Sequence, residues 1–271
     1  MINFSELQWK PQGPGRRAGA ATPMSPPRED PQLRAVPSIE AKLSPGCRIA
    51  LQGEASLSAD RFRYLRMRLR EVRELASLST LLVTSPLAQD GKSTIILNLA
   101  TTLAEGGKKS VLVIEGDLHR PSLAQKLGLD GNARLNDNGL AQCLDGDRDP
   151  FSLLWKIQPL NWYILPAGKT KENPTELMQQ DRIGEIISRL TPHFDWILVD
   201  SPPVLPLTDA MAMSKYVDAC LLVVRAHQTP KEGVEQALTI LGKKHVLGVL
   251  FNAHEGVNKS YAKYGSYYAQ K

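Results

Sequence analysis

Short apolar runs and amphipathic stretches alternate along most of this chain of 271 residues. Six nearly continuous apolar runs have the length of buried strands, at 80–84, 110–115, 161–167, 196–200, 219–224 and 246–252. Segments with helical periodicity lie between most of them, at 94–107, 174–190, 208–216 and 231–244. Buried strands that alternate with helices predict an α/β fold with a mostly parallel sheet and helices on both faces.

A further helix is predicted over 58–76, before the first of these strands. Its apolar residues recur at steps of three and four and form one face, at Phe62, Leu65, Leu69, Val72 and Leu75. Six arginines surround that face. The helix therefore suits nucleic acid, acidic lipid, a neighbouring subunit or the surface of its own domain.

Residues 1–48 have no such periodicity and contain eight of the 19 prolines. This composition is typical of a linker or a docking segment. We expect three parts: a Pro-rich flexible N-terminal arm over 1–48, an α/β domain over 49–256 and a tyrosine-rich tail over 257–271.

Charge and cysteine usage narrow the function classes. The net charge of +5 and the pI of about 9.1 point to an anionic partner, such as a nucleotide, nucleic acid or a membrane surface. The three cysteines are scattered, which argues against a zinc site or a disulfide framework and fits a reducing cytosol. Because no apolar run approaches the roughly 18 to 20 residues of a membrane span, we expect a soluble protein.

The stretch "SPLAQDGKST" follows the first predicted strand and opens a helix, as a phosphate-binding loop does. Lys92 would reach the outer phosphates, Ser93 would bind Mg²⁺ and Thr94 would lie in the first helical turn. The general motif has a glycine where Pro86 stands. Asp90 adds a negative charge beside an anion, which is unfavourable unless its side chain points to solvent.

Acidic residues follow two other predicted strands: Glu115 and Asp117 after one, Asp200 after the other. The carboxyl ends of parallel strands meet at one edge of a sheet, so these groups should lie beside the loop. That combination predicts a P-loop NTPase-like fold that binds a nucleotide with Mg²⁺. The candidate nucleotide-binding residues are Gln89, Asp90, Gly91, Lys92, Ser93 and Thr94, with Asn252 as a candidate for the adenine pocket.

Over roughly residues 57–271 the sequence resembles the bacterial tyrosine autokinases of the polysaccharide co-polymerase family, the cytoplasmic P-loop module of capsule and exopolysaccharide export. The matching segments are "VIEGDLHRP", "ILVDSPPV", "LPAGKTKENPTELM", "LTDAMAM" and the tyrosine cluster "SYAKYGSYYAQK". The resemblance implies an ATP-dependent protein-tyrosine autokinase that phosphorylates its own tail in trans.

The resemblance also implies roles for matched residues. Asp117 would accept the proton of the attacking tyrosine, Asp200 would orient the water shell of Mg²⁺, and Arg120 would steady the loop or a phosphate. The implied catalytic residues are Lys92, Asp117, Asp200 and Arg120, and the implied metal site is Ser93, Asp117 and Asp200. The implied phosphoacceptors are Tyr261, Tyr264, Tyr267 and Tyr268.

Further implications concern assembly. Asp60, Arg63 and Arg66 match an acidic residue and two arginines that the family uses for ring-like self-association. This favours a homo-oligomer and not a nucleic-acid partner. A separate membrane-anchored chain-length determinant would activate the kinase and hold it, otherwise cytoplasmic, at the inner face of the membrane.

Two rival interpretations stay open. Gln89 replaces a glycine usual in the family, Glu115 replaces an aspartate and His119 stands where arginine is common, which would suit a weakly active pseudo-kinase or a nucleotide-binding switch. A partition-type P-loop ATPase fits less well, because the loop lacks that class's additional lysine.

Overall fold

The computed structural model describes residues 30–44, 47, 49, 56–146, 148–178 and 181–253. Within these ranges one eight-stranded sheet forms the centre of the molecule, in the order β1-β4-β5-β3-β6-β2-β7-β8. All neighbouring strands are parallel except β4 and β5, which are antiparallel. The predicted P-loop NTPase-like α/β architecture is confirmed.

The strands are β1 (Ser38–Glu40), β2 (Thr80–Thr84), β3 (Val111–Glu115), β4 (Trp155–Gln158), β5 (Trp162–Leu165), β6 (Trp196–Asp200), β7 (Ala219–Arg225) and β8 (Val246–Asn252). The longer helices are α2 (Leu57–Ala76), α3 (Lys92–Ala104), α8 (Arg182–Leu190) and α10 (Lys231–Leu241). The shorter ones are α1 (Pro31–Arg34), α4 (Leu123–Lys126), α5 (Ala133–Asp137), α6 (Leu140–Leu144), α7 (Pro174–Met178), α9 (Asp209–Ser214) and the 3-10 turns η1 (Pro150–Leu153) and η2 (Thr191–His193).

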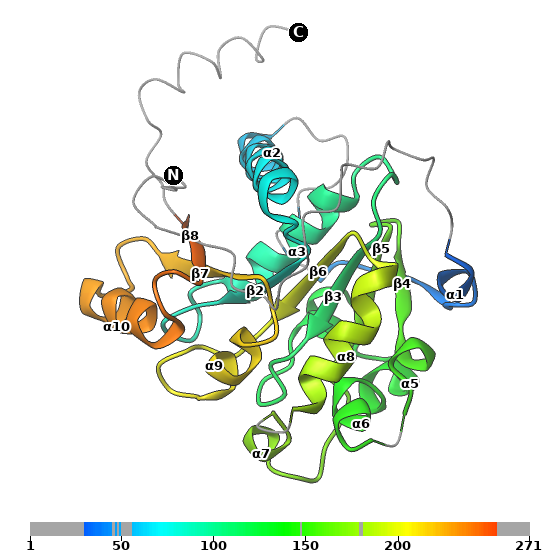
Figure 1. The fold of residues 1–271 in the computed structure, drawn as a ribbon. Coiled ribbons are helices and arrows are strands. Elements are labelled where there is room, and N and C mark those ends of the chain that lie inside the picture. Colours follow the sequence, from blue (N-terminus) through cyan, green and yellow to red (C-terminus); the bar gives the residue numbers. More distant parts are fainter. Residues whose placement is uncertain are drawn as a thin grey trace, which may run out of the picture.

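Helices cover both faces of the sheet (Figure 1). Side chains alternate along each strand, so Leu81 and Val83 of β2 join one core with α2, α3, α4 and α5, while Leu82 joins the other with α6 to α10. The helix predicted at 58–76 lies on α3 through the buried Leu65 and Leu69. Leu75 differs from the predicted face, because it is 88% exposed at the end of α2.

The six predicted strands correspond to β2, β3 and β5 to β8, but β1 and β4 were missed. The expectation of no ordered element within 1–48 is wrong for residues 30–44. Leu33 and Val36 are buried in the core, and Ile39 of β1 pairs with Ile157 of β4. These contacts come from tertiary pairing, which the irregular local pattern of apolar residues could not reveal.

The helix predicted over 174–190 is two helices, α7 and α8. In one straight helix, Leu177 and Met178 would face away from Ile183, Ile186 and Ile187. All five side chains are buried, which the separation into two helices allows.

None of the helices in the described ranges combines the length and apolar character that crossing a bilayer requires. Residues 1–29 and the predicted tyrosine tail, including Tyr261, Tyr264, Tyr267 and Tyr268, lie outside the described residues.

Candidate active site

The phosphate-binding loop connects the carboxyl end of β2 to the start of α3, as predicted. Gly91 caps α3 with a φ of 97°, in the left-handed region that favours glycine. A Cβ atom added there would lie 1.9 Å from Nδ2 of Asn252, so the position has no space for a side chain. Lys92, Ser93 and Thr94 form the first turn of α3, where backbone N–H groups are available to an anion.

Gln89 also holds a left-handed backbone, with a φ of 67°. A residue with a Cβ atom is disfavoured in this conformation by roughly 1–2 kcal/mol. The loop therefore keeps the shape that a glycine would allow even though glutamine stands there. Arg225 Nη1 donates a hydrogen bond to the backbone oxygen of Gln89, which helps to hold it.

From the sequence, the negative charge of Asp90 was compatible with a bound anion only if the side chain pointed to solvent. The structure shows that it does not. Its side chain is turned into the protein, and the residue is only 3% exposed. One carboxylate oxygen accepts the N–H of Leu87 at 3.0 Å and the other accepts the hydroxyl of Thr229 at 2.8 Å. Asn252 Nδ2 donates to the backbone oxygen of Asp90 at 2.9 Å. Asp90 and Asn252 thus hold the loop against the ends of β7 and β8.

Strand order places the acidic residues beside this loop. β6 lies between β3 and β2, and Asp200 is in register with Glu115 on one side and Val83 on the other. Lys92 Nζ lies 3.1 Å from Asp117 Oδ2, and Ser93 Oγ donates to Asp200 Oδ2 at 3.1 Å. The structure therefore brings Lys92, Ser93, Asp117 and Asp200 together, as predicted from the sequence.

Asp200 is fully enclosed, and burial raises its pKa to about 7. The nearby ammonium of Lys92 opposes that rise, while the carboxylates of Glu115 and Asp117 add to it. Its Oδ1 atom is buried without a hydrogen-bond partner among the described residues. An unpartnered buried carboxylate oxygen beside a serine hydroxyl fits the hydrated shell of a divalent cation.

Glu115 is held by backbone N–H groups, while the ammonium group of Lys92 pairs with Asp117. The Glu115 carboxylate accepts backbone N–H groups from Ser122 and Leu123, both at 2.7 Å, and from Ala167 at 3.2 Å. Burial raises the pKa of Glu115, against the effect of these three hydrogen bonds. The glutamate therefore ties the segment after β3 to the end of β5, and its extra methylene is accommodated.

From the sequence, His119 was only a residue that differs from the arginine common in the family. In the structure its ring contacts two polar side chains. Its Nε2 lies 3.0 Å from Asp209 Oδ2 and 3.2 Å from Thr175 Oγ1. These two residues belong to the "LTDAMAM" and "NPTEL" segments. His119 thus connects the segment after β3 to α7 and α9, a relation that depends on tertiary folding.

The other predicted residues lie at the border of this cluster, as Arg120 does, or far from it, as Asp60, Arg63 and Arg66 do. Arg120 donates its backbone N–H to Asp117 Oδ1 at 3.0 Å, and the residue is exposed. Arg63 and Arg66 pair with Glu105, at 3.2 and 2.5 Å, beyond the far end of α3. Since α3 has 13 residues, this is about 20 Å from the loop. Asp60 pairs with Arg63 at 3.2 Å.

No three His, Cys, Asp or Glu side chains in the described part of the chain converge closely enough to hold a metal by themselves. This agrees with the way Mg²⁺ enters nucleotide sites, where one or two carboxylates act together with phosphate oxygens and water. Ser93, Asp117 and Asp200 fit that arrangement. The loop amides and Lys92 fit the phosphates.

Comparison with known proteins places this geometry in a family. The AAA domain family model matches residues 89–246. The tyrosine-protein kinase CpsD of Streptococcus agalactiae is 30% identical over 190 residues, which are 69% of this chain and 79% of CpsD. The chain belongs to the bacterial tyrosine-protein kinase family.

Other members differ in length. The tyrosine-protein kinase Wzc of Salmonella typhi is 28% identical over 221 residues, which are 81% of this chain but only 30% of Wzc. The kinase domain of the Escherichia coli tyrosine kinase ETK has a TM-score of 0.69 at 24% identity, and the match covers 75% of this chain and 78% of the ETK chain.

The fold also occurs outside the kinases. The septum site-determining protein MinD of Pyrococcus horikoshii, solved with Mg-ADP, shares the fold at a TM-score of 0.52 and 24% identity, over 64% of this chain and 69% of the MinD chain.

Proposed function

We propose that this chain is an ATP-dependent protein-tyrosine kinase that phosphorylates tyrosines of its own C-terminal cluster in trans and regulates capsule or exopolysaccharide production. The convergence of Lys92, Asp117, Asp200 and Ser93 on one phosphate-binding loop supports it. The names of the related tyrosine-protein kinases CpsD and Wzc support the same activity.

The residues at the loop divide the work of phosphoryl transfer. The α3 amides and Lys92 bind the β- and γ-phosphates of ATP, and Ser93 with Asp200 holds the magnesium site. Mg²⁺, when bound, offsets the negative charge of the phosphate oxygens. Asp117 accepts the proton from the tyrosine hydroxyl, whose oxygen bonds to the γ-phosphorus as the bond to ADP breaks.

The pairing of Lys92 with Asp117 gives the site a defined resting state. The ammonium neutralises Asp117 until phosphate oxygens compete for it. Once Lys92 turns to the phosphates, the Asp117 carboxylate is released from this ion pair and can accept a hydrogen bond from the tyrosine hydroxyl. Nucleotide binding thereby prepares the base, and the loop needs no large rearrangement.

Assembly and location belong to the same proposal. Tyr261, Tyr264, Tyr267 and Tyr268 are the acceptors, and a second copy supplies them to the site. A ring of subunits through Asp60, Arg63 and Arg66, and a membrane-anchored chain-length protein, bring the copies together at the inner face of the membrane.

The test mixes two full-length variants with the partner's cytoplasmic segment and Mg-ATP. Lys92→Met serves as the acceptor because it keeps the tail tyrosines. A donor with all four cluster tyrosines changed to phenylalanine keeps the loop. We expect phosphotyrosine on the Lys92→Met chain only in the mixture.

Nucleotide binding by the wild type without phosphotyrosine would instead favour the regulatory nucleotide-binding subunit. Phosphotyrosine on the wild type, without any on Lys92→Met in the mixture, would keep the kinase and reject the trans arrangement.

A further inference from the structure

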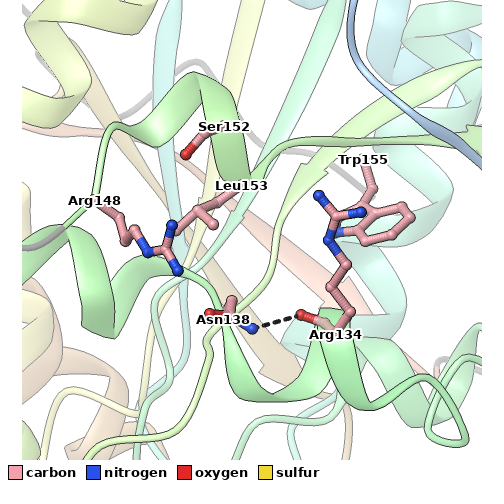
Figure 2. A pocket seen from close by; sticks show the side chains of 6 residues that line it. All are labelled: Arg134, Asn138, Arg148, Ser152, Leu153 and Trp155. Carbon is pink, nitrogen blue, oxygen red and sulfur yellow. Dashed lines mark hydrogen bonds between the residues drawn. The ribbon is translucent and has the colours of Figure 1, made fainter.

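A second site lies apart from the nucleotide loop, in a pocket of about 340 Å³. It is lined by Arg134, Asn138, Arg148, Ser152, Leu153 and Trp155. Figure 2 shows the guanidinium groups of Arg134 and Arg148 on opposite sides, with Ser152, Leu153 and Asn138 between them. The pocket combines two cations, two small polar side chains and one aromatic ring.

Three elements build this pocket. Arg134 projects from α5 and lies over the ring of Trp155, the first residue of β4, with 5.5 Å between the guanidinium carbon and the ring centroid. Arg148 comes from the loop before η1, and Ser152 from η1 itself. Stacking on Trp155 holds the planar guanidinium in one orientation, which lowers the entropic cost of binding an anion.

The two guanidinium groups that line the pocket have no carboxylate partner in the part of the chain that the structure describes. Among the described residues, no carboxylate lies within 4.0 Å of the guanidinium of Arg134 or Arg148. Two nearby acids are engaged elsewhere: Asp137 pairs with Lys169 at 2.6 Å and Asp149 pairs with Arg189 at 2.7 Å. Two unpaired guanidiniums facing one cavity favour a doubly charged oxyanion, which arginine binds in bidentate fashion.

The pocket lies at the start of β4, which is four places from β2 in the sheet order. β4 runs antiparallel to β5, and Trp155 is in register with Ile164, which is in register with Val113 of β3. The start of β4 is therefore level with the middle of β3, two strands away. At about 4.8 Å between strands, β4 is on the order of 10 Å from β3, which carries Glu115, and on the order of 20 Å from β2, which leads into the loop.

We propose that this pocket binds a phosphorylated tyrosine from the C-terminal tail of a second copy of this chain. The phosphate lies between Arg134 and Arg148, and the phenyl ring contacts Trp155. The occupant rests on the proposed function, because that reaction produces phosphotyrosine. The kinase would thus retain its own product in a pocket separate from the nucleotide loop.

The charge of the tail makes the pocket selective for the phosphorylated form. Residues 257–271 contain three lysines, Lys259, Lys263 and Lys271, and no aspartate or glutamate. The unmodified tail is therefore a cation that two arginines repel. Each phosphate adds roughly −1.5 to −2 charges at the tyrosine itself, where the two arginines can pair with it directly.

The test measures binding of synthetic 257–271 peptides to full-length Lys92→Met, which cannot modify its own tail. Fluorescence anisotropy compares the peptide phosphorylated at Tyr264 with its unphosphorylated form. We expect the phosphopeptide to bind at least about tenfold more tightly, and Arg134→Ala with Arg148→Ala to remove that difference. Arg189→Ala is the matched control, because Arg189 is a nearby arginine already paired with Asp149.

Equal binding of the two peptides would overturn the proposal. So would an unchanged difference in the double variant, or competition by inorganic phosphate or glucuronate as strong as by phosphotyrosine. Thermal unfolding of each variant shows that the fold is retained, and Arg134→Lys with Arg148→Lys, which keeps both charges, should restore part of the binding. The synthetic phosphate makes this result independent of whether the chain proves to be a kinase.

Discussion

Gln89 occupies a backbone conformation that suits glycine, inside the loop on which nucleotide binding depends. Its φ is 67°, and Gly91, two residues later, has a φ of 97°, so the loop enters the left-handed region twice. The residue is exposed, and its backbone oxygen receives the hydrogen bond from Arg225. Replacing the side chain should therefore remove strain without breaking that contact.

We predict that Gln89→Gly increases the free energy of unfolding by about 1 kcal/mol, because the strain relieved exceeds the added entropy of the unfolded chain. Urea denaturation measures this. Gln89→Ala keeps the Cβ atom and should leave the free energy nearly unchanged. A Gly variant less stable than the wild type would show that the glutamine side chain itself supports the loop.

Asp200 makes the response to nucleotide depend on pH. Its pKa of about 7 in the fold exceeds the ordinary value of 3.8, so the stability it contributes without ligand is present below 3.8 and is lost as the pH rises through 7. Binding of a cation needs the charged form. We predict that Mg-ADP raises the melting temperature more at pH 8 than at pH 6.

Thermal unfolding with and without Mg-ADP at the two pH values measures this effect. Asp200→Asn is the control. Because a neutral amide cannot ionise, Mg-ADP should raise the melting temperature of this variant by the same amount at both pH values. An increment in the wild type that falls as the pH rises would contradict the assigned role of Asp200.

The residues that could be predicted from sequence are those fixed by local order along the chain. Lys92 and Ser93 follow a strand directly, and Asp117 and Asp200 stand just after or at strand ends, so topology alone brings them together. The inward turn of Asp90 depends on Thr229, distant in sequence. No local pattern records that contact, nor the contacts of Glu115 and His119.

At the scale of elements, the missed strands share one physical feature. β1 and β4 are short, have few buried residues and lie on one side of the sheet. The buried central strands are nearly continuous in apolar residues and were all predicted. A short strand with few buried side chains is specified by the partners it pairs with, so its own sequence carries a weak signal.

The segment of β1 is anchored by the short helix before it. Leu33 of α1 is 8% exposed and belongs to the core formed with α8 and η1. Asp30 accepts a hydrogen bond from Gln32 and lies 2.5 Å from His193 Nδ1. A few contacts thus hold residues of a Pro-rich segment against the domain.

We predict that Leu33→Ala lowers the free energy of unfolding by about 2 kcal/mol, through lost apolar burial and the cavity that remains. Chemical denaturation measures it. The neighbouring exposed Gln32→Ala should have little effect, because its hydrogen bond uses the backbone N–H. A Leu33→Ala variant as stable as the wild type would mean that this segment does not stay on the domain.

At the scale of the whole molecule, α3 separates two proposed activities. The phosphate loop lies at its start, and Glu105, with Arg63 and Arg66, lies past its end. A subunit contact through the α2 arginines would form about 20 Å from the phosphates. In the single chain these arginines are already paired, so self-association has to share or exchange the Glu105 contacts.

The hydrogen bond from Asn252 to Asp90 fixes the point from which the tail departs. Ala253 follows directly, so the tether of the tyrosine cluster is rooted beside the phosphate loop. Tyr261 is eight residues further on and can reach no more than about 29 Å from that root, and Tyr268 no more than about 54 Å. The tyrosines proposed as acceptors are thereby limited to a sphere of this radius, which sets their effective concentration at every catalytic centre inside it. Whether a neighbour's centre falls within that radius would then be decided by the spacing of subunits in the proposed assembly.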